Sequence, residues 1–173
     1  MLSSVGLWSS MLKSCRAAVL LAAVAFAGAN PSFAEEDTLL VLQNGVSDPI
    51  KFDLAALDAL PQHSFDTSTQ WTEGTIAFSG PALKDILDAA QISQVEHPTI
   101  RLIAANQYEV TLEKRLLEDD VPIVATRLNG QTFGVRDKGP LWVVFPYDLK
   151  SSYQTEGVYA ASIWQLVEIK IVH

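Results

Sequence analysis

The stretch that decides the fold covers residues 135–148 and reads VRDKGPLWVVFPYD. Its middle, residues 141–145, is wholly apolar, short, and rich in β-branched and aromatic side chains, which is typical of a strand buried on both faces. Pro140 and Pro146 bound this strand because proline cannot donate a ladder hydrogen bond. The charged residues 136–138 therefore lie in a loop at the mouth of a buried strand, where ligand sites are often built. A solvated turn with a local ion pair is the competing interpretation.

The amino-terminal segment, residues 1–34, has the pattern of a cleaved export signal. Two basic residues precede an apolar run, 17–27, and residues 32–34 (Ser-Phe-Ala) fit the small-x-small cleavage pattern. The apolar run is too short for a comfortable membrane span. The sequence therefore predicts cleavage after Ala34 and a periplasmic domain of residues 35–173 with no stable membrane insertion. An uncleaved anchor is the alternative.

Charge and cysteine content limit the function classes. The chain has a formal net charge of −8, and its leader contains two basic and no acidic residues, so the predicted mature domain carries −10. Such a charge argues against nucleic acid and anionic lipid as main partners. The single cysteine, Cys15, lies in the leader. The mature domain is therefore expected to have no disulfide, thiol nucleophile or thiolate metal ligand.

The remaining sequence predicts many short strands interrupted by short helices. Strands are expected at 38–43, 50–52, 63–69, 75–78, 99–104, 108–112, 123–128 and 163–171, besides the central one. Asp53 is a good N-cap for a helix over 54–60, and a second helix is expected to start at Ser79-Gly80-Pro81. Residues 113–120 suit a short charged helix or turn, and 149–157 a polar loop. Because no βα period recurs, the predicted class is α+β, with a mostly mixed or antiparallel sheet and two or three short helices.

The sequence contains few candidates for catalytic chemistry. The three histidines, His63, His97 and His173, are not part of any metal-ligand spacing, and no glycine-rich phosphate loop is present. No base is evident for Ser162 as a nucleophile. The acidic pair Asp119-Asp120 is most simply a solvated loop. No catalytic residue and no metal ligand is therefore predicted.

Aromatic and polar residues together suggest a flat heteroaromatic ligand. Rings can stack on such a ligand, while Asp137 accepts two N–H bonds from an amino-pyrimidinone edge and Arg136 donates to its carbonyl. Trp142 and Trp164 lie inside strand patterns and are also expected as core anchors, whereas Trp71, in a turn, is the better pocket residue. The candidate binding residues are Asp137, Arg136, Trp71, Tyr108, Tyr147, Tyr159 and Ser162.

The order of several short motifs resembles the molybdopterin-binding domain of the sulfite oxidase family. The motifs are residues 78–87 (FSGPALKDIL), 106–108 (NQY), 129–130 (NG), 138–146 (KGPLWVVFP) and 162–166 (SIWQL). Each is weak alone, but the ordered set is specific and covers nearly all of residues 35–173. It looks most like the small, exported, single-domain branch of that family, which implies a sulfite oxidase-like fold.

Three departures from the family pattern bear on function. The enzymes hold molybdenum with a cysteine thiolate from a strand that corresponds to about residues 66–69, which read Asp-Thr-Ser-Thr here. Gln107 stands where an acidic residue is expected, and Ala161 where many relatives are basic. Without the cysteine, the resemblance implies a protein that binds a reduced pterin or a molybdopterin-like compound, with no metal expected, rather than an oxygen-atom-transfer enzyme.

The resemblance also implies a regulatory role. Proteins of the small branch bind reduced pterins in the periplasm and pass the signal to membrane-bound sensors, including enzymes that make or break cyclic di-GMP. The partners expected for this chain are thus a pterin and the periplasmic domain of a membrane-bound signalling protein. Two alternatives stay open: an oxidoreductase that holds molybdenum cofactor without a cysteine ligand, and a protein-interaction module with a vestigial pocket.

Overall fold

The computed structural model describes residues 37–92 and 98–172. The predicted export signal, Cys15, His97 and His173 lie outside the described residues, so the predictions made for them are not tested. No helix in the described part of the chain is long and apolar enough to cross a membrane.

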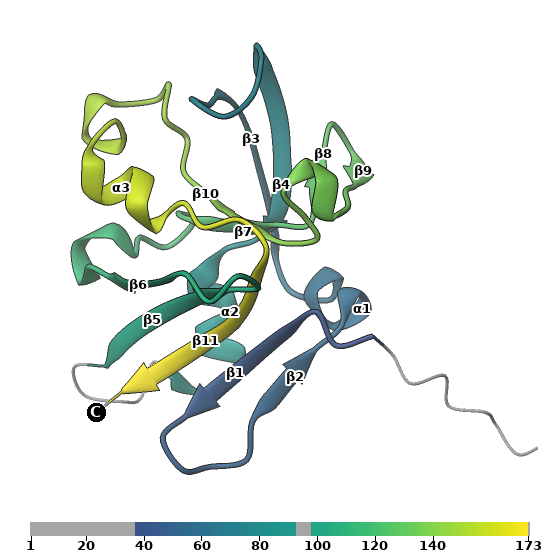
Figure 1. Cartoon of the computed structure of the whole chain (residues 1–173), viewed down its shortest axis with the longest axis vertical. Helices are drawn as coiled ribbons and strands as arrows, with labels where there is room; N and C mark the ends of the chain where they lie inside the picture. Colours follow the sequence, from purple (N-terminus) through teal and green to yellow (C-terminus); the bar gives the residue numbers. More distant parts are fainter. Residues whose placement is uncertain (1–36, 93–97, 173) are drawn as a thin grey trace, which may run out of the picture. The chain divides into compact units, whose positions relative to one another are not determined.

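The larger sheet has five strands in the order β2-β1-β11-β5-β6 (Figure 1). These strands are β1 (Leu40–Asn44), β2 (Ile50–Phe52), β5 (Thr99–Ala104), β6 (Glu109–Leu112) and β11 (Leu166–Val172). The β1–β11 pair is parallel and the other three pairs are antiparallel. The last strand of the chain therefore lies between the first strand and β5.

A second sheet has four strands in the order β3-β4-β8-β9. They are β3 (Gln62–Ser68), β4 (Thr75–Pro81), β8 (Arg127–Leu128) and β9 (Gln131–Thr132), all paired antiparallel. The prediction that a helix starts at Ser79-Gly80-Pro81 is wrong, because these residues finish β4 and pair with β3.

The predicted central strand is confirmed. β10 (Trp142–Val144) pairs antiparallel with β7 (Ile123–Ala125), and every residue from Leu141 to Phe145 has no exposed surface. The predicted single strand 123–128 is divided at Thr126, after which the chain joins the four-stranded sheet as β8. A Cβ on Gly80 would collide with the backbone carbonyl of Val124, so glycine allows β4 to lie this close to β7.

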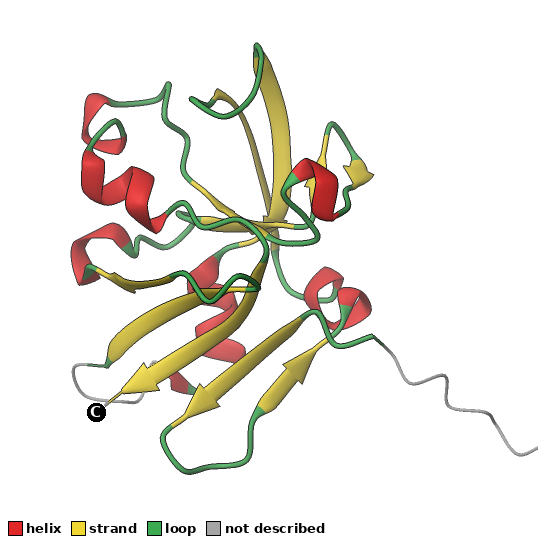
Figure 2. Ribbon diagram, in the orientation of Figure 1, coloured by secondary structure: helices red, strands yellow, loops and turns green. Residues whose placement is uncertain are grey.

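Three short α-helices complete the described chain (Figure 2). In α1 (Leu54–Asp58) the predicted cap is confirmed, since Asp53 Oδ1 accepts a 2.6 Å hydrogen bond from Ala56 N. α2 covers Leu83–Ala89. α3 (Glu156–Ala161) was not predicted, because Gly157 lies in its first turn and no side chain caps it. Short 3₁₀ turns occupy Lys114–Leu116, Val135–Asp137 and Ser151–Tyr153.

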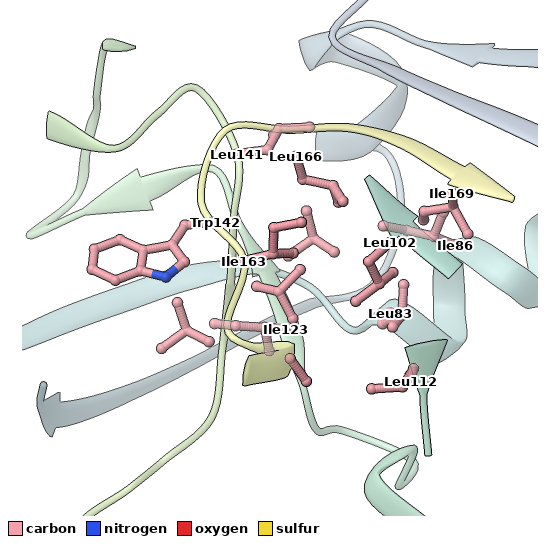
Figure 3. Close-up of a cluster of buried hydrophobic side chains, with 14 of the residues drawn as sticks. Leu83, Ile86, Leu102, Leu112, Ile123, Leu141, Trp142, Ile163, Leu166 and Ile169 are labelled. Carbon is pink, nitrogen blue, oxygen red and sulfur yellow. The ribbon is translucent and has the colours of Figure 1, made fainter. Parts of the chain in front are cut away.

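The hydrophobic core joins α2 to the five-stranded sheet. Figure 3 shows Leu83 and Ile86 of α2 beside Leu102 of β5 and Ile169 of β11. All four side chains have no exposed surface. The spacing of the apolar residues in α2 places them on one face, which explains why this seven-residue helix lies against a sheet.

Candidate functional site

Trp71 lies at the centre of an aromatic cluster. Its ring centroid is 5.5–6.2 Å from those of Trp142, Tyr147, Tyr159 and Trp164, and each pair meets edge to face. Pairs in this geometry are each worth about 0.5–1.5 kcal/mol beyond their buried area. The cluster therefore fixes the position of Trp71 although the residue belongs to the loop between β3 and β4.

Hydrogen bonds inside the β3–β4 loop also hold Trp71. Its backbone N–H donates to Thr69 Oγ1 at 3.0 Å, and that hydroxyl lies 2.8 Å from Thr72 Oγ1. The side chain of Thr69 thus replaces a backbone acceptor in the turn, as threonine often does. The loop presents its tryptophan in one orientation.

A cavity of about 240 Å³ opens beside this cluster, and we call it the aromatic pocket. Its aromatic walls come from four separate segments and are Trp71, Tyr108, Tyr159 and Trp164. The remaining lining residues are Ala104, Asn106, Ala160, Ser162 and Ile163. Apolar walls with a few polar groups are the usual composition of a small-molecule site.

The polar groups of the aromatic pocket are positioned by local hydrogen bonds. Asn106 Oδ1 accepts from the backbone N–H of Tyr108 at 3.0 Å, which closes the β5–β6 turn. The Tyr108 hydroxyl donates to the backbone carbonyl of Ala160 at 3.3 Å, although 47% of Tyr108 remains exposed. Tyr108 therefore spans from the sheet to helix α3 at the mouth of the pocket.

A buried hydroxyl chain lies beneath the pocket. Tyr147 donates to Ser162 Oγ at 2.7 Å, and Ser162 donates to the carbonyl of Val158, also at 2.7 Å. Burial raises the pKa of Tyr147 well above its usual range, despite the opposing effect of the bond to Ser162. Tyr147 is therefore a neutral structural donor at any physiological pH.

A second cavity of about 300 Å³ adjoins the first, and we call it the polar cavity. Tyr159 lines both cavities. The other residues that line the polar cavity are Ser68, Thr69, Gln70, Tyr147, Asp148 and Gln154. Of the expected binding residues, Trp71, Tyr108, Tyr159 and Ser162 thus meet in the aromatic pocket, while Tyr147 lines the polar one.

Arg136 and Asp137 lie elsewhere. They belong to an exposed 3₁₀ turn, and among the described residues that line these two cavities neither is present. The turn is anchored by its neighbours: Gln165 Nε2 donates to the carbonyl of Val135 at 2.9 Å, and Lys138 Nζ lies 5.8 Å from the centre of the Trp142 ring. The expected contact of Arg136 and Asp137 with a ligand edge stays a prediction.

The end of β3 is the place where the resemblance puts a molybdenum-ligating cysteine. Thr67 is completely buried, and its hydroxyl accepts from Asp148 N at 3.2 Å. The Asp148 carboxylate accepts from Ser68 N at 2.6 Å and from Ser68 Oγ at 2.7 Å. These bonds, the backbone one first, lower the pKa of Asp148.

The residues at this strand end do not fit molybdenum. The family uses sulfur there, whereas this chain offers hydroxyls that already take part in hydrogen bonds between β3 and the loop after β10. Within residues 37–92 and 98–172, no group of three or more His, Cys, Asp or Glu side chains is placed to hold a metal ion.

Comparison with known proteins bears on the fold. Among solved structures, the sulfane dehydrogenase SoxCD from Paracoccus pantotrophus is similar to this chain, with a TM-score of 0.57 and 17% sequence identity. The chain has a sulfite oxidase-like fold. The expected α+β class is confirmed by this likeness and by the mixed sheets and three short helices.

The sulfite oxidase-like fold is the extent of that similarity. The match covers 79% of this chain but 38% of the SoxCD chain, so this chain spans well under half the length of its neighbour. No protein-family model matches the sequence, and no curated protein matches it. The family resemblance is therefore supported as a distant fold relationship.

Sequence reasoning missed part of the pocket. Asn106 was assigned only to a turn, and Trp164 was expected mainly as a core anchor, yet both line the aromatic pocket. The strand predicted from residue 163 concealed the pocket position of Trp164, because Gln165 has a positive φ of 54° in the structure. The chain therefore turns at this point, and β11 begins only at Leu166.

Proposed function

We propose that this chain binds a reduced pterin in the aromatic pocket and acts as a periplasmic regulator rather than as an enzyme. The observation that carries the proposal is the pocket itself, where four aromatic side chains surround a small space next to the Asn106 amide and the Ser162 hydroxyl. A pterin is flat, aromatic and rich in hydrogen-bonding groups along one edge, which matches those walls.

The size of the aromatic pocket supports a ligand of this kind. Its volume of about 240 Å³ is below the range of roughly 300–1,000 Å³ that is usual for drug-sized ligands. A bicyclic ring suits such a volume, whereas a dinucleotide is too large. The fold adds support, since the sulfite oxidase-like resemblance implies pterin recognition.

The hydrogen bonds made by the side chains at the end of β3 support a regulatory role over a catalytic one. The hydroxyls of Thr67 and Ser68 are bonded to Asp148, and Tyr147 is held neutral beneath the pocket. No residue in this set acts as a thiolate ligand or as a nucleophile with an adjacent base. The partner under this proposal is a membrane-bound sensor or cyclic-di-GMP enzyme with a periplasmic domain.

Binding is tested by anaerobic titration calorimetry with 6-methyl-tetrahydropterin. We expect Tyr108→Ala to weaken binding at least about fivefold, because one stacking wall worth about 1 kcal/mol is lost. Tyr108→Phe is the matched control: it keeps the ring and removes only the hydroxyl that reaches Ala160. Absence of binding by the wild-type chain would overturn the proposal, as would stoichiometric molybdenum in protein purified from its native host.

Regulation is tested separately in the native host. Deleting the gene and restoring it as wild type, Tyr108→Ala or Tyr108→Phe should change cellular cyclic-di-GMP in step with pterin affinity. Equal levels of cyclic-di-GMP in all four strains would reject this regulatory target while leaving the calorimetric result in place.

A further inference from the structure

We propose that the outer edge of β3 (Gln62–Ser68) is a dimer interface, at which β3 of a second copy of this chain adds antiparallel with Ser64 opposite its own copy. The four-stranded sheets of the two copies then form one continuous sheet. The inference does not depend on the ligand, since it concerns the edge of a sheet and not a cavity.

β3 forms a long, regular edge of the four-stranded sheet. It has seven residues and pairs with β4 without a register shift, while within the described chain no strand pairs with its other side (Figure 1). Natural proteins usually protect such an edge with short strands, bulges, Pro or Lys, because its unpaired N–H and C=O groups are a template for another strand. β3 contains neither Pro nor Lys.

The hydrogen bonds of β4 show which backbone groups of β3 face outward. The carbonyls of Ala77 and Ser79 accept from backbone N–H groups that flank β8, at 2.7 and 2.9 Å, so these two residues direct their backbone groups toward β8. Successive residues of an antiparallel strand direct their N–H and C=O groups to opposite sides. Phe78, between them, therefore faces β3, where it pairs with Phe65.

The alternate residues of β3, Gln62, Ser64 and Asp66, consequently direct their backbone groups away from β4. Ser68, next in this series, confirms the direction, because its N–H donates to the Asp148 carboxylate at 2.6 Å. Among residues 37–92 and 98–172, no hydrogen-bond partner is present for the outward backbone groups of the other three. All three residues are exposed.

Antiparallel pairing of two copies about Ser64 uses all of these groups. Ser64 then lies opposite its own copy, Gln62 lies opposite Asp66 on either side, and each such pair exchanges two backbone hydrogen bonds. Asp66 meets a neutral amide, so no like charges oppose each other. A register centred on Phe65 requires the N–H of Ser68, which already has an acceptor.

The same register covers an aromatic side chain. Phe65 packs on the hydrophobic core but remains partly exposed. With Ser64 at the centre, Phe65 lies beside His63 of the second copy, and aromatic cross-strand pairs of this kind stabilise sheets. One register thus satisfies the hydrogen bonds, avoids charge repulsion and pairs these rings on both sides of a two-fold axis, the commonest symmetry of protein dimers.

The first experiment follows the mass of the full chain by sedimentation velocity over a dilution series. We expect a monomer–dimer equilibrium in the wild type, and Ser64→Pro should raise the dimer dissociation constant at least about tenfold. Proline removes the outward N–H and leaves the β3–β4 bonds in place, a position at which edge strands tolerate it.

Thr111→Pro is the matched control, because it makes the same change at an edge of the other sheet. The carbonyl of Tyr108 accepts from Ala104 N at 2.9 Å, so by the same alternation Thr111 of β6 directs its N–H away from β5. Thr111 is exposed, as Ser64 is. We expect this variant to keep the dissociation constant within about twofold of wild type. Equal weakening by both substitutions overturns the inference.

A disulfide tests the register and does not require the proline variant to fold. In a Cys15→Ser background the introduced cysteine is the only one. Ser64→Cys places two cysteines directly opposite each other, with Cα atoms about 5.5 Å apart, which suits a disulfide. Asp66→Cys is the control, since the two copies of residue 66 lie roughly 14 Å apart along the strands. We expect a covalent dimer on a non-reducing gel for Ser64→Cys and none for Asp66→Cys.

Three outcomes overturn the inference. A wild-type chain that stays monomeric at every concentration does so and leaves the edge to a strand from another protein. A dimer that Ser64→Pro does not weaken does so as well, and so does a dimer that Ser64→Cys does not cross-link. None of these outcomes bears on pterin binding, which calorimetry tests separately.

Discussion

The hydroxyl of Tyr147 and the hydroxyl of Ser162 form a buried 2.7 Å hydrogen bond that joins the loop after β10 to the end of α3. Tyr147 is 3% exposed and Ser162 is 2% exposed. Because the Ser162 hydroxyl donates its hydrogen bond to the backbone carbonyl of Val158, tyrosine must donate and serine accept in the bond between the two side chains. Ser162 lines the aromatic pocket, so this pair holds part of the pocket wall in place.

Removing either hydroxyl should destabilise the protein. Tyr147→Phe leaves Ser162 Oγ without its donor, and Ser162→Ala leaves a buried tyrosine O–H without an acceptor, so each should cost about 1–2 kcal/mol. The double variant should cost less than the sum of the two, since both partners are then absent. Urea unfolding of the four proteins measures this coupling, and strictly additive costs would show that the bond is not formed.

The same pair predicts a loss of stability in alkali. Burial raises the pKa of Tyr147 in the folded state above that of the unfolded chain, which is about 10. Above that pH the unfolded chain releases the tyrosine proton while the folded chain retains it, so the free energy of unfolding falls as pH rises. Tyr147→Phe should flatten this fall in the free energy of unfolding between about pH 9.5 and 11, as measured by urea unfolding at a series of pH values.

Two tryptophans expected as core anchors should behave differently. Trp142 has no exposed surface, so Trp142→Ala should cost about 3–5 kcal/mol through the cavity it leaves. Trp164 is half-buried and lines the aromatic pocket, so Trp164→Ala should cost less than about 2 kcal/mol and should weaken pterin binding. Thermal unfolding and calorimetry distinguish the two, and equal stability losses would contradict the structure.

The ion pair between Asp58 of α1 and Arg127 of β8 predicts a loss of stability in acid. Arg127 donates to both oxygens of Asp58 at 2.6 and 2.7 Å, and these hydrogen bonds lower the pKa of Asp58. Stability from the pair is present above the unfolded pKa of about 4 and is lost as pH falls through the lower folded pKa. Because the pair is about one-third exposed, Asp58→Asn should cost under about 1 kcal/mol at pH 7. Denaturation measured at a series of pH values below about 4 should show the difference between the two proteins shrinking as the pH falls.

The exposed turn at Asp137 provides a test of where the pterin edge lies. If the pterin edge lies in the aromatic pocket, which Asp137 does not line, Asp137→Asn should keep pterin affinity within about twofold. Asn106→Ala, at a residue that does line it, should weaken binding. If the Asp137 variant instead loses tenfold or more, the ligand edge lies at residues 136–137, as the sequence alone suggested.

The sequence predicted those parts of the fold that are governed by local chemistry. β5 has the predicted bounds, Asp53 caps α1, and the turn at Asn129-Gly130 joins β8 to β9. Helix α3 was missed because its stability comes from burying Val158 and Ala161 rather than from helix propensity. Local patterns cannot reveal a helix that depends on tertiary packing.

The candidate site was predicted in part for a similar reason. Aromatic residues at strand ends and in turns did converge, so Trp71, Tyr108 and Tyr159 meet around one cavity. Arg136 and Asp137 precede the buried strand in sequence, but the left-handed residue Lys138, with a φ of 71°, turns the chain between them and Pro140. Arg136 and Asp137 are therefore not among the residues that line the aromatic pocket or the polar cavity, and their contact with a ligand stays a prediction.

The position of β11 has a consequence for the time at which the protein folds. Val41 of β1 pairs with Glu168 of β11, and Ile169 pairs with Leu102 of β5. Without residues 166–172, the β1–β2 pair and the β5–β6 pair are separate hairpins, because β11 is the strand that hydrogen-bonds to both of them. Contacts of such long sequence separation make folding slow, on the order of milliseconds to seconds. The five-stranded sheet therefore cannot close until β11 is available to pair with both β1 and β5.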